Sequence, residues 1–143
     1  MGNAIVEEVM LIDDEPIDLF INEKLLTAYG FSKKYVSFQD ARQALNELEK
    51  RAESGKAFPG IIFLDYFMPL VDGFDFLVKL KEIEARTPES FRSTNVIMLT
   101  TMKAPEKRKK LEEFERILTV MNKPLTEKAV AELGKLLGQK GLN

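Results

Sequence analysis

The stretch IIFLD at residues 61–65 places four apolar residues in succession and ends at a carboxylate, Asp65. A short apolar run bounded by polar residues predicts a strand buried on both faces, as in the centre of a parallel sheet. The turn that follows, MPLVDG at residues 68–73, leads into a segment whose apolar residues have helical spacing. A buried strand followed by a helix is the repeating unit of α/β folds.

Four other short runs have strand character, and each is followed by a segment with helical spacing. The five expected strands are residues 9–12, 35–38, 61–64, 96–99 and 117–121. The expected apolar helix faces are Ile17, Phe20, Ile21, Leu25 and Ala28; Ala41, Leu45 and Leu48; Phe76, Leu80 and Ile83; Leu111 and Phe114, in a helix near 105–116; and Ala129, Leu133, Leu136 and Leu137, after a cap at Thr126. Residues 53–56 and 86–94 are expected to be exposed connections. The alternation predicts one α/β domain with a doubly wound, five-stranded parallel sheet and helices on both faces.

Composition narrows the chemistry that the 143 residues can perform. Apolar residues make up 45% of the chain, and 21 basic against 23 acidic residues give a net charge of −2, so no overall basic field invites nucleic acid. Cysteine and histidine are absent, which excludes disulfides, thiolate nucleophiles and imidazole bases. No apolar stretch approaches the ~20 residues that span a bilayer, and no signal peptide is visible, so we expect a cytoplasmic protein with no membrane partner.

Polar side chains follow four of the five expected strands. Asp13 and Asp14 follow the first, Asp65 the third, Thr100 the fourth and Lys123 the fifth. In parallel sheets these carboxyl ends share one edge, where ligands bind. Three carboxylates close together need a counter-charge, and Mg²⁺ prefers such oxygen ligands. With Mg²⁺ and a lysine beside it, an aspartate can act as a nucleophile toward phosphorus.

The combined pattern resembles the receiver domain of two-component response regulators. The matching motifs are Ile12-Asp13-Asp14, Leu64-Asp65, Met68-Pro69, Asp72-Gly73, Leu99-Thr100 and Lys123-Pro124. They predict a single receiver domain over 1–143, with a core at about residues 7–139. The resemblance implies a CheY-like, flavodoxin-like sheet of strand order 2-1-3-4-5. Because few residues remain outside this span, we expect a stand-alone receiver without a DNA-binding domain.

The resemblance assigns a role to each residue of the predicted site. Asp65 matches the aspartate that accepts a phosphoryl group from a histidine kinase or phosphotransfer protein. Asp14 matches the direct carboxylate ligand of Mg²⁺, and Asp13 matches its neighbour, which usually reaches the ion through water. Asp65 is itself expected among the metal ligands. Phe67 matches the position whose backbone carbonyl completes the metal site.

Three further positions match the family's phosphoryl-binding and signalling residues. Thr100 matches the hydroxyl that moves toward the phosphoryl oxygens, Lys123 matches the phosphoryl-binding ammonium, and Pro124 matches a cis-peptide position. The resemblance implies an unidentified downstream protein partner at the fourth helix, fifth strand and fifth helix. No residue decides whether two copies also pair there as a homodimer.

The sequence departs from the family pattern at three positions. Val120 stands where relatives carry an aromatic switch residue, and a β-branched side chain has few rotamers with which to swing. Phe67 and Met102 are apolar at positions where many relatives have polar groups that orient water. We therefore expect a long-lived phosphoaspartate, because an apolar cover excludes water from the site.

Other interpretations remain open at this point. The chain is predicted to be a signalling switch or a phosphorelay intermediate; an interaction module that does not switch is the alternative. A phosphatase of the haloacid dehalogenase type would need a second aspartate where Phe67 stands. The basic run at residues 107–110 has glutamates on both sides, so it predicts a solvated helix face or a protein contact rather than a nucleic-acid site.

Overall fold

The computed structural model describes residues 4–87, 94–101, 103–114 and 116–139. Strands and helices alternate along this part of the chain, as predicted. The strands are β1 (Val6–Ile12), β2 (Ser32–Phe38), β3 (Ile61–Asp65), β4 (Asn95–Thr100) and β5 (Ile117–Asn122). The helices are α1 (Pro16–Ala28), α2 (Ala41–Ser54), α3 (Gly73–Ala85), α4 (Pro105–Glu112) and α5 (Glu127–Gln139). Among the described residues, no helix has both the length and the apolar character needed to cross a membrane.

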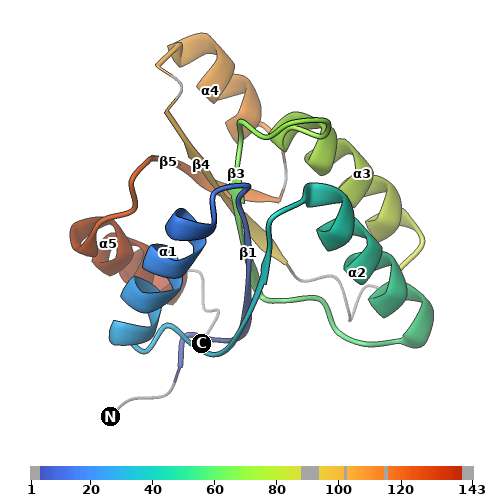
Figure 1. Ribbon diagram of the computed structural model, residues 1–143, viewed down its shortest axis with the longest axis horizontal. Coiled ribbons are helices and arrows are strands. Elements are labelled where there is room, and N and C mark those ends of the chain that lie inside the picture. Colours follow the sequence, from blue (N-terminus) through green and yellow to red (C-terminus); the bar gives the residue numbers. More distant parts are fainter. Residues whose placement is uncertain (1–3, 88–93, 102, 115, 140–143) are drawn as a thin grey trace.

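The strands form one sheet in the order β2-β1-β3-β4-β5, and every neighbouring pair is parallel. Helices α1 and α5 cover one face and α2 and α3 cover the other (Figure 1). Leu111 of α4 packs in the same cluster as α2 and α3, so α4 belongs to that second face. This arrangement confirms the predicted doubly wound fold and strand order. The connections after β1 and β3 leave toward opposite faces, so a crevice opens between the ends of these two strands.

The central strand β3 is buried on both faces, as its apolar run predicted. Ile61 and Phe63 pack with α1 and α5, while Ile62 and Leu64 pack with α2 and α3. All four side chains are at most 1% exposed. Burial of these side chains holds the end of β3, and therefore Asp65, in a rigid setting.

The predicted inward face of α1 is wrong for four of its five residues; only Leu25 is half-buried and packs against the core. Ile17, Phe20 and Ile21 are 70%, 62% and 49% exposed, and Ala28 is exposed as well. The side that packs against the sheet and α5 instead carries Leu19, Asn22 and Leu26. Apolar residues lie on most of the helix circumference, so their spacing alone could not identify the buried side.

Several predicted boundaries also move. Helix α2 continues through Ser54 and ends at Gly55, whose φ of 75° lies in the left-handed region that glycine favours. Helix α4 ends at Glu112, four residues earlier than expected. Thr87 and Thr94, at the ends of the connection predicted to be exposed, are buried instead, and their hydroxyls donate hydrogen bonds to backbone carbonyls. Residues 88–93 of that connection lie outside the described residues.

Candidate functional site

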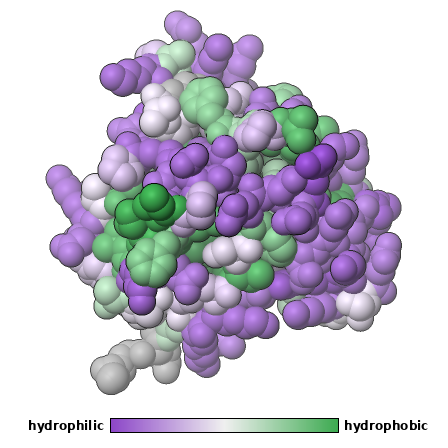
Figure 2. Space-filling view, viewed as in Figure 1, coloured by the Kyte–Doolittle hydropathy of each residue, from purple (hydrophilic) through white to green (hydrophobic). Residues whose placement is uncertain are grey.

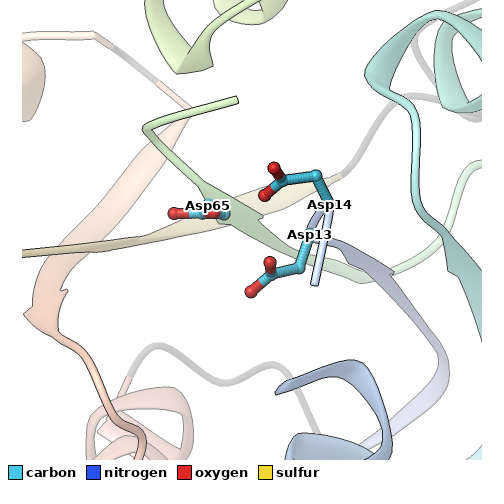
Figure 3. Close-up of side chains that lie close together, drawn as sticks. All are labelled: Asp13, Asp14 and Asp65. Carbon is cyan, nitrogen blue, oxygen red and sulfur yellow. The ribbon is translucent and has the colours of Figure 1, made fainter. Parts of the chain in front are cut away.

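The carboxyl ends of β1 and β3 bring three aspartates together. Ile12 pairs with Leu64 in the sheet register, so Asp13 and Asp14 emerge beside Asp65. One carboxylate oxygen from each aspartate lies within 4.8 Å of the other two. Figure 3 shows the three side chains extending to the same side of the sheet edge. Asp13 and Asp65 are 2% and 4% exposed, whereas Asp14 is half-buried.

Lys123 reaches this cluster from the end of β5. Its backbone N–H donates to the carbonyl of Thr100 at 3.1 Å, and the peptide bond to Pro124 is cis, as expected. The Nζ atom donates a hydrogen bond to Asp13 Oδ2 at 3.0 Å and lies 3.4 Å from Asp65 Oδ2. The predicted lysine is thus in contact with the predicted phosphoacceptor.

The electrostatics of the cluster favour a proton or a cation. Burial, followed by the charge of Asp13, raises the pKa of Asp65 to about 7, although Lys123 lowers it in part. Burial alone would lower the pKa of Lys123, but its hydrogen bonds to Asp13 and Asp18 and the charge of Asp65 raise that pKa overall. Lys123 therefore stays charged at neutral pH, and it does not fully compensate the three carboxylates.

The donor set fits a hard divalent cation. The three aspartates of the cluster offer carboxylate oxygens, which suit Mg²⁺. A cation would offset both causes that raise the pKa of Asp65, which are burial first and the negative charge of Asp13 next. Asp13, Asp14 and Asp65 would hold the ion. Phe67 lines the same cavity with a side chain that is 52% exposed, and the role of its backbone carbonyl stays a prediction.

A cavity of about 510 Å³ opens beside the aspartates. Its lining mixes charged, polar and apolar residues from the ends of the strands, from α1 and from the segment before α5; the lining residues are Asp14, Glu15, Asp18, Ile21, Asn22, Asp65, Phe67, Leu99, Thr101, Lys123, Pro124 and Leu125. The volume admits a phosphoryl group and part of its donor.

The loop between Asp65 and α3 is held tightly. Asp72 caps α3 by accepting a hydrogen bond from the N–H of Asp75 at 2.9 Å, and the N–H of Gly73 donates to the carbonyl of Tyr66. A Cβ at position 73 would lie 2.9 Å from the Tyr66 ring and 3.0 Å from the sulfur of Met98. Glycine is therefore required for this close approach.

Thr100 is fully buried at the end of β4, opposite Asn122 of β5. Its neighbours Leu99 and Thr101 line the cavity. Thr100 is the last residue of β4, where the sequence placed it, and its role in signalling stays a prediction. Met102, the other apolar position expected to exclude water, lies outside the described residues.

Strand β5 is tied to α4 at the position expected for an aromatic switch. Val120 is 6% exposed, and Arg108 of α4 donates one hydrogen bond to its carbonyl at 2.9 Å and another to Asn122 Oδ1 at 2.8 Å. Lys107, Lys109 and Lys110 of the basic run are exposed, as predicted for a solvated helix face, whereas Arg108 is half-buried against β5.

The sequence analysis missed Asp18. This residue lies in the first turn of α1, and its Oδ2 is 3.1 Å from Lys123 Nζ. An acidic residue in the first turn of a helix is usually explained by its favourable interaction with the helix dipole. That explanation gave no reason to expect a contact of Asp18 with Lys123, more than a hundred positions away. The available signal was an acidic residue one helical turn beyond Asp14.

Comparison with known proteins gives a consistent result. The family model described as "Response regulator receiver domain" matches residues 9–133. Among curated proteins, the chain is 26% identical over 93 residues to "Probable methanogenesis regulatory protein FilR2" of Methanothrix harundinacea, covering 65% of this chain and 57% of that protein. It is also 26% identical over 144 residues to "Two-component response regulator ORR1" of Oryza sativa subsp. indica, covering 94% and 56%. The chain thus spans little more than half the length of these relatives.

Solved structures share the fold over nearly the whole chain. A two-component response regulator from Cytophaga hutchinsonii superposes with a TM-score of 0.76 at 24% identity, covering 93% of this chain and 98% of the other. A response regulator receiver protein from Dyadobacter fermentans gives 0.71 at 25% identity, covering 92% and 98%. The arrangement of strands and helices described above is therefore common to these proteins.

Proposed function

Because the chain belongs to the response regulator receiver domain family, we propose that it accepts a phosphoryl group on Asp65 and acts as a switch or relay in two-component signalling. The donor would be a phosphohistidine of a histidine kinase or phosphotransfer protein. The observation that carries this proposal is the cluster at one sheet edge, where Asp65 lies within 4.8 Å of Asp13 and Asp14 and contacts Lys123.

The chemistry follows from these side chains. An ionised Asp65 oxygen attacks the phosphorus, the new P–O bond forms, and the bond from phosphorus to the donor nitrogen breaks as the imidazole leaves. Lys123 can then shift from the Asp65 carboxylate, 3.4 Å away, to a phosphoryl oxygen. A divalent cation at Asp13 and Asp14 would neutralise the charge that gathers there. Phosphoryl transfer needs mainly such positioning and charge neutralisation.

The exposed face of α1 supports a protein as the donor. Ile17, Phe20 and Ile21 form a continuous apolar patch, visible in green over α1 in Figure 2. Ile21 also lines the cavity that holds Asp65. A donor that reaches Asp65 from this side would cover the patch and bury its apolar surface.

The first experiment is phosphorylation with acetyl phosphate and Mg²⁺, followed by intact mass. We expect one added phosphoryl group on the wild type, none on Asp65→Asn, and none on the wild type when EDTA is added beforehand. Asp75→Asn, in an exposed part of α3, is the matched aspartate control and should still be phosphorylated. Absence of an adduct on the wild type, together with failure to bind beryllofluoride, would contradict the proposal.

The donor surface has its own test. Phe20→Ser should slow transfer from any histidine phosphotransfer protein that phosphorylates the wild type, and leave the rate with acetyl phosphate unchanged. Val78→Ser, which removes an exposed apolar side chain from α3, is the control. An equal loss of phosphorylation rate with acetyl phosphate and with the phosphotransfer protein would show that Phe20 affects the site around Asp65 and not a docking surface.

An interaction module that does not switch is the second candidate. The specific observation in its favour is the tie between Arg108 and the backbone of Val120, at a strand without an aromatic side chain. The discriminating measurement is the affinity for a target protein before and after phosphorylation. A changed affinity supports the switch, and an unchanged affinity supports the module.

A further inference from the structure

Lys123 contacts three carboxylates, and one of them stands apart from the aspartate cluster. Its Nζ atom lies 3.0 Å from Asp13, 3.1 Å from Asp18 and 3.4 Å from Asp65. The Asp18 side chain is 39% exposed and lines the mouth of the cavity, while those of Asp13 and Asp65 are 3% and 5% exposed. Within the described residues, Asp18 does not belong to the group of aspartates able to share a cation.

The charge balance shows why this fourth carboxylate matters. With all groups ionised, Asp13, Asp14, Asp18 and Asp65 contribute −4 and Lys123 contributes +1, which leaves −3. A divalent cation would reduce the charge of these five side chains to −1, and without Asp18 their charge would be zero. Asp18 therefore leaves the carboxylates in excess over their counter-charges, and it is the one of them that an anionic phosphoryl group can replace at Lys123.

We propose that Asp18 is a positioning residue that competes with the phosphoryl group for Lys123 and so weakens the binding of small anionic phosphoryl compounds at Asp65. This inference rests on the proposed function. An ammonium has three N–H donors, and the three carboxylates around Lys123 can engage all of them. A phosphoryl oxygen must displace one carboxylate, and Asp18 is the least buried of the three.

The competition gives the site a preference between donors. A small acyl phosphate has few contacts with which to offset the repulsion from Asp18. A protein donor gains additional contact elsewhere, for example on the apolar face of α1, where Phe20 is 62% exposed. Asp18 thus disfavours phosphorylation by free metabolites more than phosphorylation by a protein partner.

The test compares Asp18→Asn with wild type for beryllofluoride affinity, by calorimetry in Mg²⁺, and for the rate of phosphorylation by acetyl phosphate. We expect beryllofluoride to bind about three- to tenfold more tightly to the variant, and KM for acetyl phosphate to fall by a similar factor. The gain should shrink as ionic strength rises, because mobile ions screen the charge. Asp18→Glu, which keeps the carboxylate, should stay close to wild type.

Glu15→Gln is the matched control. Glu15 lines the same cavity and carries the same charge, and the ion pairs described for Lys123 do not include it. Its removal should change beryllofluoride affinity less than twofold. An equal gain in this variant would overturn the proposal, since surface charge in general would then explain the effect.

Three other outcomes would also overturn it. Unchanged or weaker beryllofluoride binding by Asp18→Asn, in a protein with the wild-type circular dichroism spectrum, would show that Asp18 does not compete for Lys123. A loss of Mg²⁺ affinity greater than tenfold would place Asp18 among the metal ligands. Failure of the wild type itself to bind beryllofluoride or accept a phosphoryl group would instead remove the proposed function, and the inference with it.

Discussion

Replacing Asp65 by asparagine should stabilise the metal-free protein while abolishing phosphorylation. The carboxylate lies buried beside Asp13 and Asp14, and its ionisation in the folded state is opposed by burial first and by these charges next. Asparagine has nearly the same shape without the charge. The substitution therefore removes a cost that the proposed function imposes on folding.

The magnitude follows from the pKa of Asp65. It rises from 3.8 to about 7 on folding. At ~1.4 kcal/mol per pKa unit, ionised Asp65 lowers the free energy of unfolding by up to about 4 kcal/mol. Since relaxation and water in the open cavity reduce this value, we expect asparagine to add about 1–3 kcal/mol at pH 7.5 in EDTA.

The pH dependence has a definite sign. Because the pKa of Asp65 is higher in the folded state, the folded protein binds more protons between about pH 4 and pH 7 than the unfolded chain. The wild type therefore gains stability from this group as the pH falls through 7, whereas the asparagine variant does not. The difference between them should be largest above pH 7 and disappear near pH 4.

The assay is urea unfolding of both proteins at several pH values, with and without Mg²⁺. Magnesium should stabilise the wild type by mass action and narrow the difference. Glu112→Gln, which removes an exposed carboxylate from α4, is the control and should change stability by less than about 0.5 kcal/mol. An asparagine variant that is less stable than wild type in EDTA, or a difference independent of pH, would refute the reasoning.

Two further predictions concern contacts away from the aspartates. Glu8 accepts hydrogen bonds from the buried Arg51 at 2.7 and 2.8 Å, so Glu8→Gln should lower the free energy of unfolding by about 2–3 kcal/mol. Glu7 is exposed, and the control Glu7→Gln should lower the free energy of unfolding by less than about 0.5 kcal/mol. Burial alone would raise the pKa of Glu8, but Arg51 lowers that pKa overall. The stabilisation by Glu8 should therefore persist above pH 4.5 and be lost at more acidic pH, as measured by urea unfolding. Equal losses of stability in Glu8→Gln and Glu7→Gln would contradict this prediction. Arg108→Ala should release α4 from β5 and speed amide hydrogen exchange at Asn122 with little loss of global stability, and unchanged exchange would show that the tie is unimportant.

Local sequence patterns predicted the architecture well. The apolar run at residues 61–64, the glycines and prolines of the turns and the alternation of segments depend on neighbours a few positions away. The ends of the strands could be predicted for the same reason. Since all the strands are parallel, Asp13, Asp65 and Lys123 had to meet at one edge once the order of strands was known.

The rotation of α1 could not be predicted in this way. Apolar residues occupy two overlapping stripes of that helix, and the choice between them depends on packing against distant partners. Leu26 packs in one cluster with Phe31 of the following turn and Leu133 of α5, and this contact leaves Phe20 exposed. Burial depends on the whole fold, whereas periodicity is a local property.

The sequence by itself determined the succession of strands and helices and the residue types at the sheet edge, because both follow from short-range spacing. Only the tertiary structure decided that Lys123 binds Asp18 as well as Asp13, that Arg108 is tied to β5, and which face of α1 stays open. Lys123 and Asp13 are 110 positions apart in the chain. Contacts over such separations depend on how helices and strands pack together, which no local pattern specifies.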